Sequence, residues 1–172
     1  MPGSGKSVVA RMLQRRLLEK GVRSQILSSD ELRKTVTPTP TYSQDERDTV
    51  YGLLAFVANL LARNGVNTII DATGNLRKYR DECRSMVERF AEVYLKCPLE
   101  VCVEREATRV ETLHAPRGIY EKAVKGRAST VPGIGSPYEE PLGPEVVVES
   151  DKLTPDECAD AILNRLGNFL LT

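Results

Sequence analysis

The stretch Pro2-Gly3-Ser4-Gly5-Lys6-Ser7 decides how the rest of this sequence is interpreted. It follows the pattern G-x-x-x-x-G-K-[ST], whose first glycine would stand just before Met1. Its two glycines allow backbone conformations in which successive N–H groups point toward one anion. Apolar residues with helical spacing come next, so we expect a helix over residues 6–20 that ends at Gly21. Because a helix N-terminus carries partial positive charge, the whole unit is typical of a phosphate-binding loop.

The side chains of this loop suit ATP together with Mg²⁺. Lys6 is expected to reach the β- and γ-phosphates, and the hydroxyl of Ser7 is expected to bind Mg²⁺. The alternative is a Gly-rich helix entry that binds no ligand. The predicted ATP-binding residues of the loop are Pro2, Gly3, Ser4, Gly5, Lys6 and Ser7.

Length and composition predict a single globular domain over residues 1–172. The chain is 41% hydrophobic and 28% charged, which is the composition of a soluble protein with a real core. Its 24 basic residues balance 24 acidic residues, which disfavours nucleic acid as a partner. No apolar run approaches the ~18 residues of a membrane span, and no signal peptide is visible. We therefore expect a cytoplasmic protein with no membrane partner.

The cysteines agree with that compartment. Cys83, Cys97, Cys102 and Cys158 form no CxxC pair, and the chain has a single histidine, His114. This set argues against a zinc site. Cys97 and Cys158 lie in apolar segments, so we expect both to be buried, reduced thiols.

Helix and strand signals alternate along the chain. Apolar runs predict strands over residues 22–27, 66–71, 91–97 and 145–149. Helices are expected to begin near residue 29 and to span 43–64, 76–90, 98–105, 118–125 and a C-terminal segment from 154. The strands are continuously apolar, as in a parallel sheet covered on both faces. The fold class expected is therefore α/β, with three layers and a parallel sheet.

Local signals mark helix starts and an irregular region. Ser43 with Glu46, and Thr154 with Glu157, have the spacing of capping boxes. Residues 106–117 show no clear period and predict a surface insertion. Residues 126–144 are rich in Gly and Pro and predict a long irregular segment. Together they form a lid region over about residues 106–144.

Two aspartates are candidates for chemistry at the carboxyl edge of the sheet. Asp30 follows the first strand, where ligands of open α/β sheets bind, and could accept a proton from a hydroxyl or order the waters of Mg²⁺. N-terminal capping of the next helix is the alternative for Asp30. Asp71 ends the following strand and could orient a Mg²⁺-bound water, with a purely structural carboxylate as its alternative. The predicted catalytic residues are Lys6 and Asp30, and the predicted metal ligands are Ser7, Asp30 and Asp71.

Arginines cluster in the sequence near the same edge. Arg33, Arg47 and Arg77 follow strand ends or begin helices. Arg47 lies one turn into a capped helix, which is a good position from which to bind an anionic acceptor. Solvated surface charge is the alternative for each of them.

Four longer runs carry a resemblance to a known family. They are EVYLKCPLEVCVER over 92–105, GIYEKAVKG over 118–126, GIGSPYEEP over 133–141 and PEVVVESDKLTPDE over 144–157. With the phosphate loop, they make nearly the whole chain resemble adenylylsulfate kinase (APS kinase). The resemblance implies a P-loop kinase that transfers the γ-phosphate of ATP to the 3′-hydroxyl of adenylylsulfate. It implies Lys6 and Ser7 as ATP and Mg²⁺ residues, Asp30 as the base, and Arg105 as an ATP-binding residue near the lid.

The acceptor side departs from the family pattern. The usual D-G-D is Ser28-Ser29-Asp30, an expected Asn is Val50, and F-I-S-P-Y-R becomes TGNLRK over residues 73–78. An expected Lys and aromatic residue become Ser129 and Val131. The resemblance and the edge position predict that Arg33, Arg47, Asn75 and Arg77 bind the acceptor.

The partners expected are ATP and a small anionic substrate that bears a hydroxyl, and a homodimer remains open. Two alternatives stay open for function. One is a small P-loop kinase for another hydroxyl, such as a nucleotide, a polynucleotide 5′-hydroxyl or a small metabolite. The other is a non-catalytic nucleotide-binding module.

The beginning of the chain carries a structural expectation. In folds of this type, as the resemblance implies, a central strand leads into the phosphate loop, yet this sequence starts inside the loop. We therefore expect this sequence to be an N-terminally truncated version of a longer protein in which Met1 is an internal methionine. The missing strand would leave a gap between the strands expected at residues 66–71 and 91–97.

Overall fold

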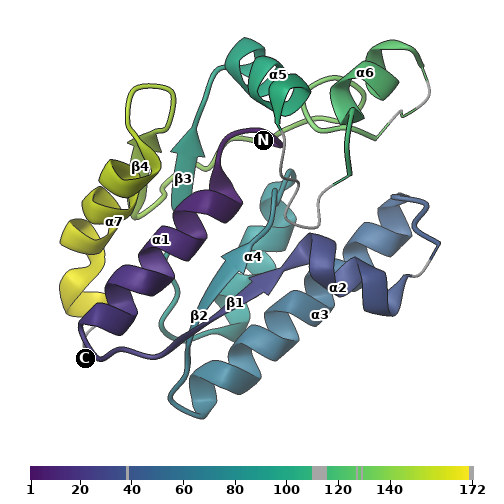
Figure 1. Cartoon of the computed structure of the whole chain (residues 1–172). Helices are drawn as coiled ribbons and strands as arrows, with labels where there is room; N and C mark the ends of the chain where they lie inside the picture. The colour runs from purple at the N-terminus through teal and green to yellow at the C-terminus, as the bar shows by residue number, and fades with distance from the viewer. Residues whose placement is uncertain (38, 110–115, 127, 129, 171–172) are drawn as a thin grey trace.

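The computed structural model describes residues 1–37, 39–109, 116–126, 128 and 130–170. Helices and strands alternate along these residues, with the helices arranged around the strands (Figure 1). In chain order the elements are α1 (Lys6–Glu19), β1 (Ser24–Ser28), α2 (Ser29–Val36), α3 (Gln44–Arg63), β2 (Asn67–Asp71), α4 (Arg77–Met86), β3 (Val93–Lys96), α5 (Leu99–Thr108), α6 (Ile119–Val124), β4 (Val146–Glu149) and α7 (Pro155–Leu170).

The strands are parallel and lie between two helical layers. β1 pairs with β2, with Ile26 opposite Ile69, and β3 pairs with β4. Ile69 packs against the core formed by α1, β4 and α7, whereas its neighbour Ile70 packs against the core formed by α3 and α4. Because successive strand residues point to opposite faces, this alternation places helices on both sides of the strands. The expected three-layer α/β arrangement is confirmed.

A hollow separates the two strand pairs. β2 and β3 belong to different pairs, so they are not hydrogen-bonded to each other. A cavity of about 440 Å³ lies here, and its lining includes Leu13 of α1, Ile69 of β2 and Leu95 of β3. We call this cavity the slot. The expected gap between residues 66–71 and 91–97 is confirmed.

The two predicted capping boxes differ in the structure. Thr154 and Glu157 exchange bonds in both directions, because the Thr154 N–H donates to Glu157 Oε2 at 2.8 Å and the Glu157 N–H donates to Thr154 Oγ1 at 3.2 Å. Ser43 Oγ accepts the Glu46 N–H at 3.3 Å, but the Glu46 carboxylate accepts from Thr41 and Tyr42 instead of from Ser43. Only the Thr154–Glu157 box is therefore complete.

Three expectations are corrected. The helix predicted over residues 76–90 ends at Met86, because Val87 turns into extended backbone and packs into the core beside α3. The predicted surface insertion at 106–117 begins inside α5, and Glu106 is buried there. Cys97 is only half-buried, whereas Cys158 is buried as predicted. Residues 110–115, His114 among them, and Ser129 lie outside the described part of the chain.

Candidate active site

The phosphate loop has the backbone that its glycines predict. Gly3 has φ +79° and Gly5, the N-cap of α1, has φ +89°, a region that other residues rarely adopt. A Cβ on Gly3 would also overlap the carbonyl oxygen of Cys102 in α5. Gly3 is thus required both for the turn and for the close approach of α5 to the loop.

The side chain of Lys6 is hydrogen-bonded to the phosphate loop. Its Nζ donates to the carbonyl oxygen of Met1 at 2.9 Å, and the Ser4 hydroxyl donates to the same oxygen at 2.8 Å. Burial lowers the pKa of Lys6, while the negative charges of Asp71 and Asp30 oppose that shift. The ammonium group therefore lies within electrostatic reach of both predicted carboxylates.

Asp30 does not cap its helix, because Ser28 does. Ser28 is the N-cap of α2, and its hydroxyl accepts the Glu31 N–H at 3.4 Å. The capping alternative for Asp30 is therefore wrong. Burial raises the pKa of Asp30, Lys6 lowers it and Asp71 raises it. Lys6, Asp30 and Asp71 thus influence one another electrostatically.

Arg33 sits in a buried ion pair that the sequence did not reveal. Its guanidinium pairs with the Glu46 carboxylate, and both side chains are less than 10% exposed, at 7% and 8%. The ring of Tyr42 lies 5.0 Å from the Arg33 guanidinium carbon, and Tyr42 has a left-handed φ of 56° that a tyrosine rarely adopts. Glu46 and Tyr42 therefore contact the predicted site residue Arg33, and the sequence did not predict these contacts. No short motif connects them to Arg33.

Arg47 joins three segments around the acceptor side. Its Nε donates to the Tyr42 carbonyl at 3.2 Å, and its other nitrogens donate to Asn75 Oδ1 at 3.5 Å and to the Thr130 carbonyl at 2.6 Å. All three oxygens that accept hydrogen bonds from Arg47 are uncharged. No salt bridge to Arg47 is found in the described part of the chain.

Asn75 and Arg77 contact the end of the lid region. The Asn75 amide donates to Ser136 Oγ at 3.3 Å and to the Pro137 carbonyl at 3.1 Å, and the side chain is fully buried. The Arg77 N–H donates to Glu139 Oε2 at 2.7 Å. These contacts fix residues 136–139 over the loop that follows β2.

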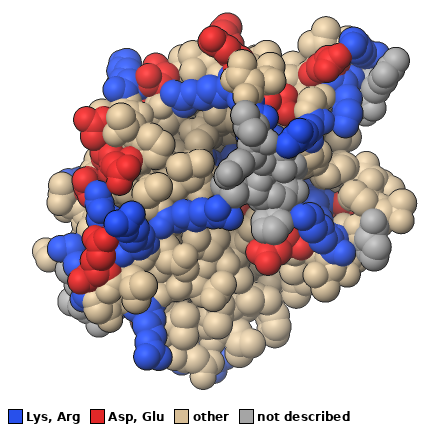
Figure 2. Space-filling model, viewed as in Figure 1, with Lys and Arg blue, Asp and Glu red and all other residues tan. Residues whose placement is uncertain are grey.

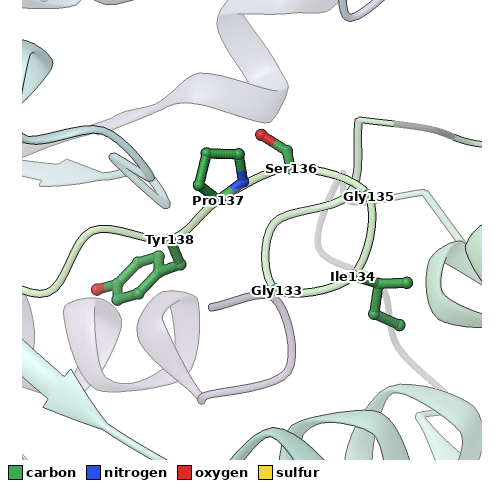
Figure 3. Close-up of a pocket in the computed structure, with 6 residues that line it drawn as sticks. All are labelled: Gly133, Ile134, Gly135, Ser136, Pro137 and Tyr138. Atoms are coloured by element: carbon green, nitrogen blue, oxygen red, sulfur yellow. The ribbon is translucent and has the colours of Figure 1, made fainter.

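The lid region also contacts the phosphate loop. The hydroxyl of Tyr120 in α6 donates to the Pro2 carbonyl at 2.9 Å, and a Cβ on Gly133 would overlap the side chain of Met1. Residues 133–138 line an open hollow of about 540 Å³. The side chains of Ile134 and Tyr138 lie on opposite sides of this loop (Figure 3). The lid and the phosphate loop are thus in direct contact.

Arg105 lies on the side of α5 that faces the end of β4. One of its terminal nitrogens donates to the Ser150 carbonyl at 2.9 Å, and the other lies 3.9 Å from Cys97 Sγ. Arg105 therefore links α5 to two segments that follow strand ends.

The oxygen donors of the site suit a hard cation. Ser7, Asp30 and Asp71 offer a hydroxyl and two carboxylates, which are ligand types that Mg²⁺ accepts. Among the described residues, no cluster of three or more His, Cys, Asp or Glu side chains could hold a metal ion. A cation here would depend on phosphate and water for its remaining ligands, as Mg²⁺ in nucleotide sites does.

Comparison with known families identifies the architecture. Residues 1–149 match the family model described as "Adenylylsulphate kinase". The chain belongs to the adenylylsulfate kinase family. The probable adenylyl-sulfate kinase of Pyrococcus abyssi is 36% identical over 163 residues, which are 95% of this chain and 88% of that protein. The adenylyl-sulfate kinase of Rippkaea orientalis is 36% identical over 166 residues, 96% of this chain and 87% of that protein.

A solved adenylylsulfate kinase has the same fold. The structure of the Mycobacterium tuberculosis APS kinase CysC in complex with AMPPNP and APS matches with a TM-score of 0.85 and 32% identity. The match covers 97% of this chain and 93% of that one. The predicted fold class and family resemblance are confirmed. None of the described helices has the length and hydrophobicity that a bilayer crossing requires.

Proposed function

We propose that this adenylylsulfate kinase family member transfers the γ-phosphate of ATP to the 3′-hydroxyl of adenylylsulfate. The observation that carries the proposal is the linked group of Lys6, Asp30 and Asp71 at the entry of α1. A cation at a phosphate-binding loop beside a carboxylate with a raised pKa is the arrangement that phosphoryl transfer to an alcohol requires.

The residues of the loop hold the donor. The N–H groups at the start of α1 and the ammonium of Lys6 would bind the phosphates of ATP and stabilise the charge of the transferred group. Arg105 of α5, which lies beside the end of β4, is assigned as a further ATP-binding residue. Catalysis would then consist mainly of positioning and charge neutralisation.

Asp30 is assigned as the base. Its carboxylate would accept the proton of the attacking hydroxyl, since no capping bond occupies it and Lys6 lies within electrostatic reach. Ser7, Asp30 and Asp71 would hold Mg²⁺ directly or through water. When bound, Mg²⁺ neutralises phosphate charge and orients the phosphates.

Arg47 is the strongest candidate to bind an anionic group of the phosphoryl acceptor. Its three described bonds go to uncharged oxygens, whereas the charge of Arg33 is already paired with Glu46. Asn75 and Arg77 would shape the acceptor side by fixing residues 136–139. Figure 2 shows basic and acidic side chains interspersed over the visible face, which supports a small anionic acceptor rather than a polynucleotide.

A kinase for another small alcohol is the second candidate. Val50 replaces a family Asn and is fully buried in the core beside Tyr51 and Tyr79, and Asn75 is occupied by the lid. In this structure the Val50 side chain is buried in the core, and the Asn75 amide is bonded to residues 136 and 137. The acceptor is therefore the part of the proposal that most needs a direct test.

An ATP-turnover screen tests the proposal. Purified protein is assayed with adenylylsulfate beside a panel of nucleotides, an oligonucleotide with a free 5′-hydroxyl and small anionic alcohols. We expect adenylylsulfate to give the highest kcat/KM, with Lys6→Ala inactive toward every acceptor. A better acceptor elsewhere in the panel would favour the second candidate, and ATP binding with no turnover would favour the non-catalytic module.

Three further assignments belong to the proposal. The 172 residues act as one kinase domain with a lid over about residues 106–144. All four cysteines are free, which supports a reducing compartment such as the cytoplasm. A homodimer is kept as the assembly to be checked by light scattering.

A further inference from the structure

Arg80 of α4 is a nearly buried arginine whose guanidinium meets three separate segments of the chain. Its side chain is 14% exposed. One terminal nitrogen donates to the Gly74 carbonyl in the loop after β2, and the other donates to the Glu139 carbonyl in the lid region at 2.7 Å. The Nε lies 2.5 Å from Oε1 of Glu92, the residue just before β3. Arg80 therefore joins the loop after β2, the lid region and the start of β3.

Gly74 is held at both of its backbone polar groups. Its carbonyl accepts the bond from Arg80, and its N–H donates to the Tyr51 hydroxyl of α3 at 2.9 Å. Gly74 has φ +51°, and a Cβ there would lie 3.4 Å from Arg80 Cγ, so the glycine lets the backbone rest on the aliphatic stem of the arginine. The course of the loop after β2 is therefore fixed where the loop enters the acceptor side.

This loop continues into a residue assigned to the acceptor side. Asn75 follows Gly74 directly, and its carbonyl accepts the Glu139 N–H at 2.8 Å while its Oδ1 accepts a bond from Arg47 at 3.5 Å. Glu139 thus bonds to Asn75 through its N–H and to Arg80 through its carbonyl. Loss of the Arg80 guanidinium would release one carbonyl on each side of this junction. Asn75 and the lid region would then keep fewer of the bonds that place them beside Arg47.

We propose that Arg80 is a positioning residue for the phosphoryl acceptor; this inference rests on the proposed function. Its guanidinium keeps the loop after β2 and the lid region in one arrangement before a substrate arrives, which reduces the ordering cost of binding. Among the described residues, its hydrogen bonds and ion pair go to Gly74, Glu139 and Glu92, and none goes to the phosphate loop. Arg80 should therefore affect the acceptor far more than ATP.

Steady-state kinetics of Arg80→Met test the assignment, with ATP and the best acceptor of the turnover screen varied in turn. Methionine keeps an unbranched apolar stem and removes the donors. We expect the KM for the acceptor to rise about tenfold or more, as the loss of two hydrogen bonds predicts, while the KM for ATP stays within about twofold. Arg80→Lys should recover part of the acceptor affinity, because an ammonium keeps a charged donor. Equal rises in both KM values, or no rise for the acceptor, would overturn the proposal.

Arg84→Met is the matched control. Arg84 lies one turn further along α4 and pairs with Glu145 at 2.7 Å and with Glu92 at 3.8 Å, and these partners lie outside both the loop after β2 and the lid region. Its loss should lower the melting temperature and leave both KM values unchanged. An Arg80→Met variant that behaves in the same way would make Arg80 a purely structural residue.

Amide hydrogen exchange in the unliganded protein gives a readout that needs no substrate. The Glu139 N–H bonds to the Asn75 carbonyl, and the Arg77 N–H bonds to the Glu139 carboxylate at 2.7 Å. Both amides should exchange about tenfold faster in Arg80→Met and at the unmodified rate in Arg84→Met. Unchanged exchange in Arg80→Met would contradict the positioning role. A failure of adenylylsulfate in the turnover screen leaves these rates valid, and a failure here leaves the turnover result standing.

Discussion

Lys6 is the residue on which donor binding most directly depends. It is the cation of the phosphate loop, it is buried enough for its pKa to be lowered, and two carboxylates lie within its electrostatic reach. Lys6→Ala should weaken ATP binding and nearly abolish turnover, since it removes the mobile charge that follows the phosphates. Titration and a phosphotransfer assay measure the two effects. Phosphotransfer at the unmodified rate would contradict the phosphate-loop assignment.

The catalytic role of Asp30 can be tested independently of helix capping, because Ser28 caps α2. Asp30→Asn should lower kcat about 100-fold or more and leave the melting temperature nearly unchanged. Ser28→Ala is the matched variant, and it should lose about 1 kcal/mol of stability with kcat retained. An Asp30→Asn variant with normal kcat and a lower melting temperature would make Asp30 a structural residue.

The same residue predicts a pH profile. Burial raises the pKa of Asp30, and a general base must be deprotonated to act. The rate should therefore fall on acidification at a pH above the ordinary aspartate value of about 3.9. Asp30→Asn should lack this limb of the kcat profile. A limb that persists in the variant would assign it to another group.

Residues that act through a local motif could be predicted from the sequence, and residues that act through packing could not. Lys6 and Ser7 are specified by six consecutive residues, and the position of Asp30 follows from one strand end. The partner of Arg33 is Glu46, which reaches it only after α2 and α3 pack together. Likewise, the burial of Val50 depends on Tyr51 and Tyr79 stacking beside it, which requires α4.

At the scale of elements, Glu46 attaches the loop before α3 to α2. Its carboxylate accepts the N–H groups of Thr41 and Tyr42 and pairs with Arg33. Glu46→Ala leaves the buried Arg33 charge without its partner, which typically costs about 3–5 kcal/mol. Urea unfolding should show this loss, and a Glu46→Ala variant as stable as the unmodified protein would show that solvent replaces the partner.

This ion pair also predicts acid sensitivity. Burial would raise the pKa of Glu46, but hydrogen bonds from Thr41 and Tyr42 and the charge of Arg33 lower it overall. A lowered pKa means that the stabilisation is present above the unfolded value of about 4.3 and is lost as the pH falls through the folded value. Glu46→Gln should therefore lose less stability than the unmodified protein when the pH is lowered from 5 toward 2.

Helix boundaries were predictable where the stop signal is local. Gly21 and Gly65 follow α1 and α3 in the structure as in the sequence, because a left-handed glycine ends a helix without tertiary contacts. The end of α4 was missed, since Val87 and Phe90 continue its apolar spacing. Both side chains pack against Ala55 and Ala58 from a non-helical segment, so packing rather than local propensity ends the helix.

At the scale of the whole molecule, the slot limits stability. Among the described residues, β2 and β3 have no strand partner across the slot. Backbone amides without a partner cost about 1–3 kcal/mol each where they are shielded from water. An N-terminal extension of about ten residues that supplies an apolar strand should pair with both edges. A gain of about 5 kcal/mol would raise the melting temperature by roughly 10–20 °C.

A matched extension separates pairing from added length. A Gly/Ser-rich extension of equal length cannot fill an apolar slot, so it should leave the melting temperature and ATP affinity unchanged. The strand-forming extension should raise both, because it leads directly into the phosphate loop. If the two extensions behave alike, the slot does not accept a strand.

The slot also divides the amide hydrogens of the sheet into two kinds. In a parallel strand, the backbone groups of successive residues point alternately to the two neighbouring strands. Since β2 and β3 are each paired on one side, alternate amides in them are held by a neighbour and the others face the slot. In heavy water the two kinds should exchange at different rates, giving an alternating slow and fast pattern along each strand. Exchange measured residue by residue would thus trace which edge of each strand is open.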